Sequence, residues 1–257
     1  MMAPVAAGGW RVMGGFREAL AGLRHAQKTS KGAPAYSRLV NRPLGRLLAA
    51  AAHTAGMTPN QVTAVSAAFT FAGIATICTE TPSPASSVAV CLLLVAGYAL
   101  DAADGQLARL RGGGSIAGEW LDHVVDAVKI ASLHLAVLIS WYRFGDRTDA
   151  QLLIPIGFQV TASVLFFVII LNDRIRRAQR GSSAMILAGE GRSSTLYSLA
   201  VVPTDYGLLC VSFVVMFWEA GFLWVYAALM AANAAFAVLA LAKWYREMRA
   251  YDVAQRG

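Results

Sequence analysis

Apolar side chains dominate several long stretches of the chain instead of marking a single stripe along amphipathic helices. Four uncharged runs are each long enough for an α-helix to cross the ~30 Å hydrocarbon core of a bilayer, namely residues 58–79, 81–100, 151–172 and 220–242. Two further apolar segments are 115–144, which contains Asp122, Asp126 and Lys129, and the shorter 204–218. The pattern predicts an all-α integral membrane protein with six transmembrane helices.

The segment before the first span has an amphipathic pattern. Arg38, Arg42 and Arg46 recur every four residues within 36–54, with leucines between them. This pattern predicts a helix that lies in the membrane interface. No internal repeat divides the chain, so we expect residues 33–250 to form one membrane domain. We expect a flexible N-terminal segment (1–32) before it and a C-terminal tail (251–257) after it.

Composition agrees with a membrane location and adds an orientation. Hydrophobic residues make up 57% of the chain and charged residues only 14%, whereas charged residues form about a quarter of an ordinary soluble domain. If both termini are cytoplasmic, 19 of the 22 basic residues lie on the inner side, as the positive-inside rule requires. We therefore expect a multi-pass protein of the cell membrane whose net charge of +7 serves topology and contact with the anionic lipid bilayer. We do not expect nucleic acid as a partner, because the sequence has no basic stripe interleaved with aromatic residues.

Four carboxylates stand inside or at the ends of predicted spans. Asp101 and Asp104 share one face at the end of the second span, and Asp122 and Asp126 share one face of the third. The glycine-rich turn 111–115 makes these two helices antiparallel and brings the carboxylates together near the cytoplasmic surface. An ionised Asp at bilayer depth costs at least ~2.5 kcal/mol, so a compensating cation is expected. Oxygen ligands without His or Cys favour Mg²⁺, Mn²⁺ or Ca²⁺ over zinc.

Two glycines flank this acidic cluster. Gly105 and Gly118 lack Cβ atoms and would let a phosphate or a nucleotide ring approach the helices, although helix packing is the simpler explanation of either glycine taken singly. Metal-binding carboxylates beside such an opening suggest phosphoryl transfer, in which a spare carboxylate deprotonates an attacking hydroxyl. The alternative is an ion-coupled transporter with a carboxylate relay, but the first, fourth and sixth predicted spans carry no matching charges.

The acidic cluster and its glycines match a known signature. The pattern Asp-x2-Asp-Gly-x2-Ala-Arg-x8-Gly-x3-Asp-x3-Asp resembles that of the CDP-alcohol phosphotransferase family. Every fixed position is present: Asp101, Asp104, Gly105, Ala108, Arg109, Gly118, Asp122 and Asp126. The segment from Thr58 to Thr63 also resembles one that is common in this family, and six spans behind an interfacial helix agree with its fold.

The resemblance implies a reaction and a role for each matching residue. An alcohol hydroxyl would attack the β-phosphorus of a CDP-linked donor, releasing CMP and forming a phosphodiester. Asp101, Asp104 and Asp122 would hold two divalent metal ions, Mg²⁺ or Mn²⁺, with Asp126 as a further ligand and the general base. The implied nucleotide contacts are Asn60, Thr63, Gly105, Ala108, Arg109 and Gly118. Members of the family are typically homodimers.

The sequence constrains the acceptor alcohol less than the donor. Arginines after the fourth span could bind a phosphorylated alcohol such as inositol phosphate or glycerol phosphate, and positive-inside topology explains them equally well. These residues are Arg174, Arg177, Arg180 and Arg192. Our hypothesis is a phospholipid synthase that uses CDP-diacylglycerol and such an acceptor. The alternatives are transfer of a CDP-linked headgroup to a lipid alcohol, the transporter, and a catalytically silent relative that binds lipid or nucleotide.

Lys129 lies one helical turn after Asp126. Two interpretations stay open: Lys129 pairs with Asp126 and keeps that carboxylate ionised, or it snorkels to another acid. We expect Lys129→Met to lower turnover without abolishing metal binding.

Overall fold

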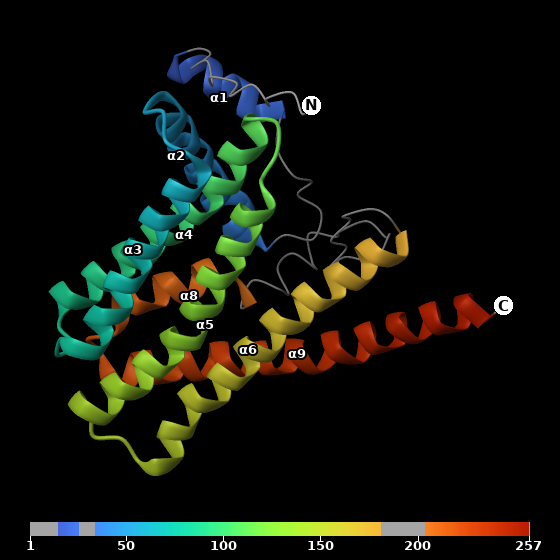
Figure 1. Ribbon diagram of the computed structural model, residues 1–257. Coiled ribbons are helices and arrows are strands. Elements are labelled where there is room, and N and C mark those ends of the chain that lie inside the picture. Colours follow the sequence, from blue (N-terminus) through green and yellow to red (C-terminus); the bar gives the residue numbers. More distant parts are fainter. Residues whose placement is uncertain (1–14, 26–33, 181–203, 257) are drawn as a thin grey trace, which may run out of the picture.

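The computed structural model describes residues 15–25, 34–180 and 204–256, which form helices joined by short connections (Figure 1). In chain order the helices are α1 (Phe16–His25), the π-helical η1 (Ser37–Asn41), α2 (Arg42–Thr54), α3 (Pro59–Thr79), α4 (Pro84–Leu110), α5 (Ile116–Phe144), α6 (Asp149–Arg180), α8 (Tyr206–Ser212), the 3₁₀ turn η3 (Phe213–Val215) and α9 (Glu219–Arg256). No strand occurs among the described residues. The all-α class predicted from the sequence is confirmed.

Five helices are long and apolar enough to cross a membrane: α3, α4, α5, α6 and α9. The helical segment Tyr206–Val215 is shorter and covers about 15 Å at 1.5 Å per residue, roughly half of the hydrocarbon thickness. The predicted span over 204–218 is therefore a short apolar helix in the structure, and the count of six spans stays a prediction. Large apolar side chains such as Leu92, Phe167 and Leu239 are exposed on the outside, which suits an integral membrane protein.

Small residues let α3 and α4 pack closely. The Ser66 hydroxyl donates a hydrogen bond to the backbone oxygen of Gly97 at 2.9 Å, and a Cβ atom at Gly97 would collide with the Thr70 side chain. Both helices begin with a proline in the first turn and a capping box. The close contact fixes the rotation and depth of α4, which carries Asp101 and Asp104.

The helix expected before the first span is present as η1 and α2, and both α1 and α2 pack against α4. We expected residues 1–32 to be flexible, but α1 lies within this segment and buries Ala19 and Leu23 against the α2 and α4 side chains. The reason is its amphipathic pattern, which gives the short helix an apolar face to bury. At Gly45 of α2, a Cβ atom would lie 2.9 Å from Ala102 Cβ. The N-terminal helices therefore back the half of α4 that bears the acidic residues.

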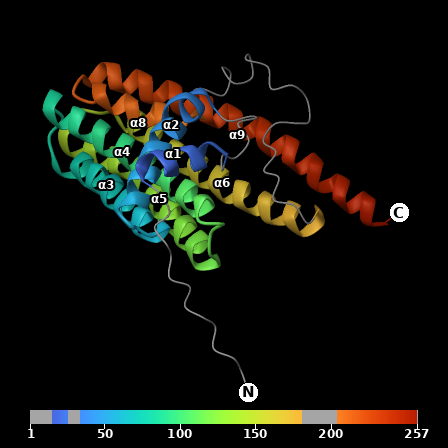
Figure 2. The same ribbon diagram turned by 90° about the horizontal axis from the view of Figure 1, so that it is seen from above.

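Helices α6 and α9 are longer than a simple membrane crossing, with 32 and 38 residues. Their C-terminal parts project from the rest of the bundle (Figures 1 and 2). The Arg176 guanidinium donates two hydrogen bonds of 2.7 Å to the Glu247 carboxylate and thereby joins the two helices. The helix α9 continues to Arg256, through most of the segment 251–257 that we expected to be a tail.

The main apolar core lies away from the acidic residues. Its largest fully buried side chains include Leu94 of α4, Leu133 of α5, Phe213 of η3, and Phe222 and Tyr226 of α9. Leu94 lies in the N-terminal half of α4 and Leu133 in the C-terminal half of α5, whereas the motif aspartates occupy the other half of each helix. The main apolar core and the motif aspartates thus occupy opposite halves of α4 and α5.

Candidate active site

The connection between α4 and α5 sets the geometry of the acidic residues. The N–H groups of Gly112 and Gly113 donate to carbonyl oxygens in the last turn of α4 at 3.1 and 3.0 Å, which is a Schellman ending. Their φ angles of +93° and +130° lie in the region that favours glycine. Ser115 then caps α5 by accepting a hydrogen bond of 3.0 Å from the Gly118 N–H. The chain reverses within residues 111–115, and α5 runs antiparallel to α4 as predicted.

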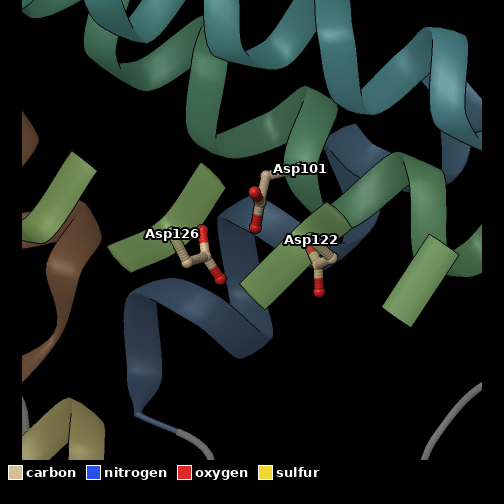
Figure 3. Close-up of side chains that lie close together, drawn as sticks. All are labelled: Asp101, Asp122 and Asp126. Atoms are coloured by element: carbon tan, nitrogen blue, oxygen red, sulfur yellow. The ribbon is translucent and has the colours of Figure 1, made fainter. Parts of the chain in front are cut away.

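Three carboxylates from these two helices converge below the turn. Asp101 of α4 and Asp122 and Asp126 of α5 each offer one oxygen, and the three oxygens lie within 4.8 Å of one another. Figure 3 shows the Asp101 side chain reaching from α4 toward the two α5 side chains. All three residues are half-buried, and α3 packs against both helices that carry them. Such a group of oxygen ligands could hold a metal ion.

Asp104, the fourth predicted ligand, lies outside this group of three. It is buried, and its Oδ2 accepts a hydrogen bond of 2.6 Å from the hydroxyl of Thr63 on α3. The structure therefore brings three of the four motif aspartates together and links the fourth to a predicted nucleotide contact.

Lys129 joins the same cluster. Its Nζ lies 2.5 Å from Asp101 Oδ1 and 3.1 Å from Asp126 Oδ1, and the residue is only 6% exposed. The sequence left open whether Lys129 pairs with Asp126 or with another acid. In the structure it does both, since one ammonium group bridges α4 and α5.

The predicted nucleotide contacts come from three helices around the acids. A Cβ atom at Gly118 would lie 3.0 Å from Asn60 Oδ1, so the beginnings of α3 and α5 meet there. A Cβ atom at Gly105 would lie 3.4 Å from Arg109 Nη1, and Ala108 is half-buried on the same helix. The glycines thus sit beside polar side chains, and a larger residue at Gly118 would crowd Asn60.

Comparison with known proteins identifies the family. The sequence profile described as CDP-alcohol phosphatidyltransferase matches residues 56–239, which is well over half of the chain. The chain belongs to the CDP-alcohol phosphatidyltransferase family. It is therefore a CDP-alcohol phosphotransferase, and the family resemblance drawn from the motif is confirmed.

A solved structure has a similar fold. The crystal structure of Mycobacterium tuberculosis phosphatidylinositol phosphate synthase with CDP-DAG bound matches with a TM-score of 0.50 and 23% sequence identity, covering 79% of this chain and 92% of that chain. No curated protein sequence matches this chain. The structural similarity supports the helical membrane fold of this CDP-alcohol phosphotransferase.

Two of the predicted acceptor residues of this CDP-alcohol phosphotransferase lie together on α6. Arg174 Nη2 and Arg177 Nη1 are each 3.2 Å from the same oxygen of Glu119, which stands in the first turn of α5. Arg180 is the last residue of α6, but its side chain lies outside the described part of the chain, as does all of Arg192. The structure therefore brings two of the four arginines to the motif-bearing helix.

Glu119 is not a fixed position of the motif, and its sequence pattern indicates no role for it. Its position three residues before Asp122 puts it on the motif face of α5, which was the available signal. Its partners Arg174 and Arg177, however, belong to another helix, so only the packing of α5 against α6 reveals the contact.

Proposed function

We propose that this CDP-alcohol phosphotransferase transfers a phosphatidyl group from CDP-diacylglycerol to the hydroxyl of a phosphorylated polyol, such as inositol phosphate or glycerol phosphate, and releases CMP. The observation that carries the proposal is the convergence of Asp101, Asp122 and Asp126 within the segment that matches the family profile. The similar fold of a phosphatidylinositol phosphate synthase that was crystallised with CDP-DAG supports this choice of donor.

The acidic residues suit a hard divalent cation. Oxygen ligands surround Mg²⁺ at about 2.0–2.1 Å, and three oxygens within 4.8 Å of one another can approach such an ion with small side-chain movements. Asp101, Asp122 and Asp126 would hold the metal, and Asp104 would complete a site for two ions, Mg²⁺ or Mn²⁺. A bound metal neutralises the charge of the donor's diphosphate.

Asp126 is the proposed general base. Its carboxylate takes the proton of the acceptor hydroxyl while the hydroxyl oxygen attacks the β-phosphorus of the donor. A new bond forms between the acceptor oxygen and this phosphorus, the bond from the phosphorus to the bridging oxygen breaks, and that oxygen leaves with its electron pair as part of CMP. The residues proposed to surround the cytidine and its phosphates are Asn60, Thr63, Gly105, Ala108, Arg109 and Gly118.

Arg174 and Arg177 are the proposed binding site for the acceptor's phosphate. Both already share one anionic partner, Glu119 Oε1, so a phosphate group would take the place of that carboxylate. Guanidinium groups bind phosphate oxygens through paired, charge-assisted hydrogen bonds. Arg180 and Arg192 belong to the same proposed binding region.

We also propose that the active site and both termini face the cytoplasm, and that the enzyme is a homodimer. The concentration of basic residues on one side of the predicted spans supports this orientation. A cytoplasmic site would draw a water-soluble acceptor from the cytoplasm and the lipid-linked donor from the bilayer.

The test is a screen of acceptors with the purified protein in nanodiscs. Radiolabelled CDP-diacylglycerol is supplied with Mg²⁺ or Mn²⁺ and with inositol phosphate, glycerol phosphate or unphosphorylated inositol, and both CMP release and lipid product are measured. We expect one phosphorylated polyol to support turnover, and we expect Asp122→Asn to reduce it at least about a hundredfold, in line with the loss of a metal ligand or its close support. The matched control is Asp146→Asn, a carboxylate in the exposed α5–α6 connection.

Two outcomes would contradict the proposal. Turnover only with a CDP-linked headgroup and a lipid alcohol would assign the enzyme to the alternative reaction, in which the headgroup is transferred from CDP to the lipid hydroxyl. Release of CMP without any dependence on an acceptor would remove the role that we give to the α6 arginines. The transporter alternative has lost its support, because the chain belongs to an enzyme family.

A further inference from the structure

Lys129 is the cationic side chain that contacts two of the three converging carboxylates. Its ammonium lies 2.5 Å from Asp101 Oδ1 and 3.1 Å from Asp126 Oδ1. The side chain is 7% exposed, against 23% for Asp101 and 30% for Asp126, so Lys129 is more buried than the two acids that it joins. These two carboxylates also belong to the group whose oxygens could hold a metal ion.

We propose that the Lys129 ammonium is an internal cation that holds Asp101 and Asp126 together while no divalent metal is bound, and that metal must displace it from these oxygens. The proposal rests on the metal site of the proposed function. It adds that Lys129 lowers the affinity of the site for metal and keeps the metal-free site intact.

The first part of the argument is the metal-free protein. Asp101 and Asp126 come from different helices and would repel each other across a poorly solvated space. One ammonium between them replaces that repulsion with two short, charge-assisted hydrogen bonds. The contact also links α4 to α5 at the level of the site, so the carboxylates stay close enough to receive an ion.

The second part is competition. A divalent ion at about 2 Å from the same oxygens would lie within a few ångströms of the ammonium, and two cations at that separation repel strongly in a partly buried site. The four-carbon stem of lysine lets its ammonium withdraw when the ion enters. Each metal-binding event therefore includes the loss of the Lys129 contacts.

The test measures Mn²⁺ binding without any CDP-alcohol. Purified full-length wild type, Lys129→Met and Lys129→Arg are titrated with Mn²⁺, and free Mn²⁺ is followed by electron paramagnetic resonance. We expect Lys129→Met to bind Mn²⁺ about tenfold or more tightly than wild type, because the competing charge is gone. Lys129→Arg keeps the charge and should stay near the wild-type affinity. The matched control is Lys243→Met on α9, which is exposed and should leave Mn²⁺ affinity unchanged.

A second measurement determines the thermal stability of the metal-free protein. In EDTA, Lys129→Met should unfold at a lower temperature than wild type, and Mn²⁺ should raise its unfolding temperature by more than it raises that of wild type. If Lys129→Met does not fold, Lys129→Gln, which keeps a hydrogen-bond donor without the charge, takes its place in both measurements.

The outcomes separate this proposal from the proposed function. Wild type that binds Mn²⁺ while the neutral variants bind it equally or more weakly would overturn the role of Lys129 as a competing cation and leave the metal site standing. Wild type that neither binds Mn²⁺ nor releases CMP in the acceptor screen would overturn the metal-dependent function itself, and the proposal for Lys129 with it.

Discussion

The carboxylate of Asp104 shows how one hydrogen bond can connect two binding functions. Thr63 on α3 donates to its Oδ2 at 2.6 Å, and both residues are buried. The signature predicted Asp104 as a metal ligand and Thr63 as a nucleotide contact. Because the two side chains are hydrogen-bonded, a substitution at either residue should also affect the function of the other.

We therefore expect Thr63→Val to impair the enzyme. The substitution keeps the shape of the side chain but removes a donor from a buried carboxylate, a loss of about 1–2 kcal/mol. If that loss falls on the transition state, turnover decreases roughly 5- to 30-fold, measured as CMP release at saturating donor. Thr63→Ser retains the hydroxyl and should keep most of the activity. Full activity of Thr63→Val would show that Asp104 does not need this contact.

At the scale of elements, the α3–α4 pair is the rigid part on which the site is built. Gly97 permits the close approach because it has no Cβ atom to collide with Thr70, and the Ser66 hydroxyl donates a hydrogen bond to the Gly97 backbone oxygen. Helices in a membrane gain little from burying apolar surface against each other, so small residues that allow close packing have a large share in their association. The depth of Asp101 and Asp104 then follows from the rotation of α4.

Gly97→Ala should reduce stability because the added methyl group meets the Thr70 side chain and the α3 backbone. Overpacking of this kind costs about 1–3 kcal/mol, which thermal unfolding in detergent would detect. The control is Gly157→Ala in α6, where the nearest atom to the new Cβ is Met230 Sδ at 4.0 Å. There the substitution should be neutral or stabilising by up to ~1 kcal/mol, because alanine favours the helix. Equal unfolding temperatures for the two variants would contradict the close-packing argument.

At the scale of the whole molecule, the number of membrane crossings sets the side on which each terminus lies. Five helices are long enough, and the apolar helix Tyr206–Val215 is shorter. An even number of crossings places both termini on one side, as the distribution of basic residues favours. The topology thus depends on whether the short helix and its neighbours complete a sixth crossing.

Cysteine labelling in intact cells would decide this. After replacement of the three native cysteines, single cysteines are placed at exposed positions in three connections and near the C-terminus: Thr81, Gly114, Asp146 and Asp252. A membrane-impermeant maleimide should label Thr81→Cys and Asp146→Cys directly, but Gly114→Cys and Asp252→Cys only after lysis. Direct labelling of Asp252→Cys together with protection of Gly114→Cys would mean an odd number of crossings.

The amino-acid sequence by itself determined the helices and the chemistry of the motif. Long uncharged runs must form helices in a bilayer because every backbone polar group has to be satisfied within the segment. The spacing of Asp122 and Asp126 puts them on one face of a helix whatever surrounds it. These are local properties, so the helices α3, α4, α5, α6 and α9 and the shared face of Asp122 and Asp126 could be predicted. The glycine-rich turn 111–115 added the expectation that α4 and α5 bring their acids together, but not which of the four aspartates meet.

Only the tertiary structure decided which side chains from different helices meet. It joined Lys129 to Asp101 as well as to Asp126, gave Asp104 a partner on α3, and set Glu119 between two arginines of α6. It also packed α1, which lies within the N-terminal segment (1–32) that we expect from the sequence to be flexible, against α2 and α4. The reason is physical: helix formation depends on neighbouring residues, whereas these contacts depend on the rotation and depth of whole helices, which the packing of small and apolar residues fixes.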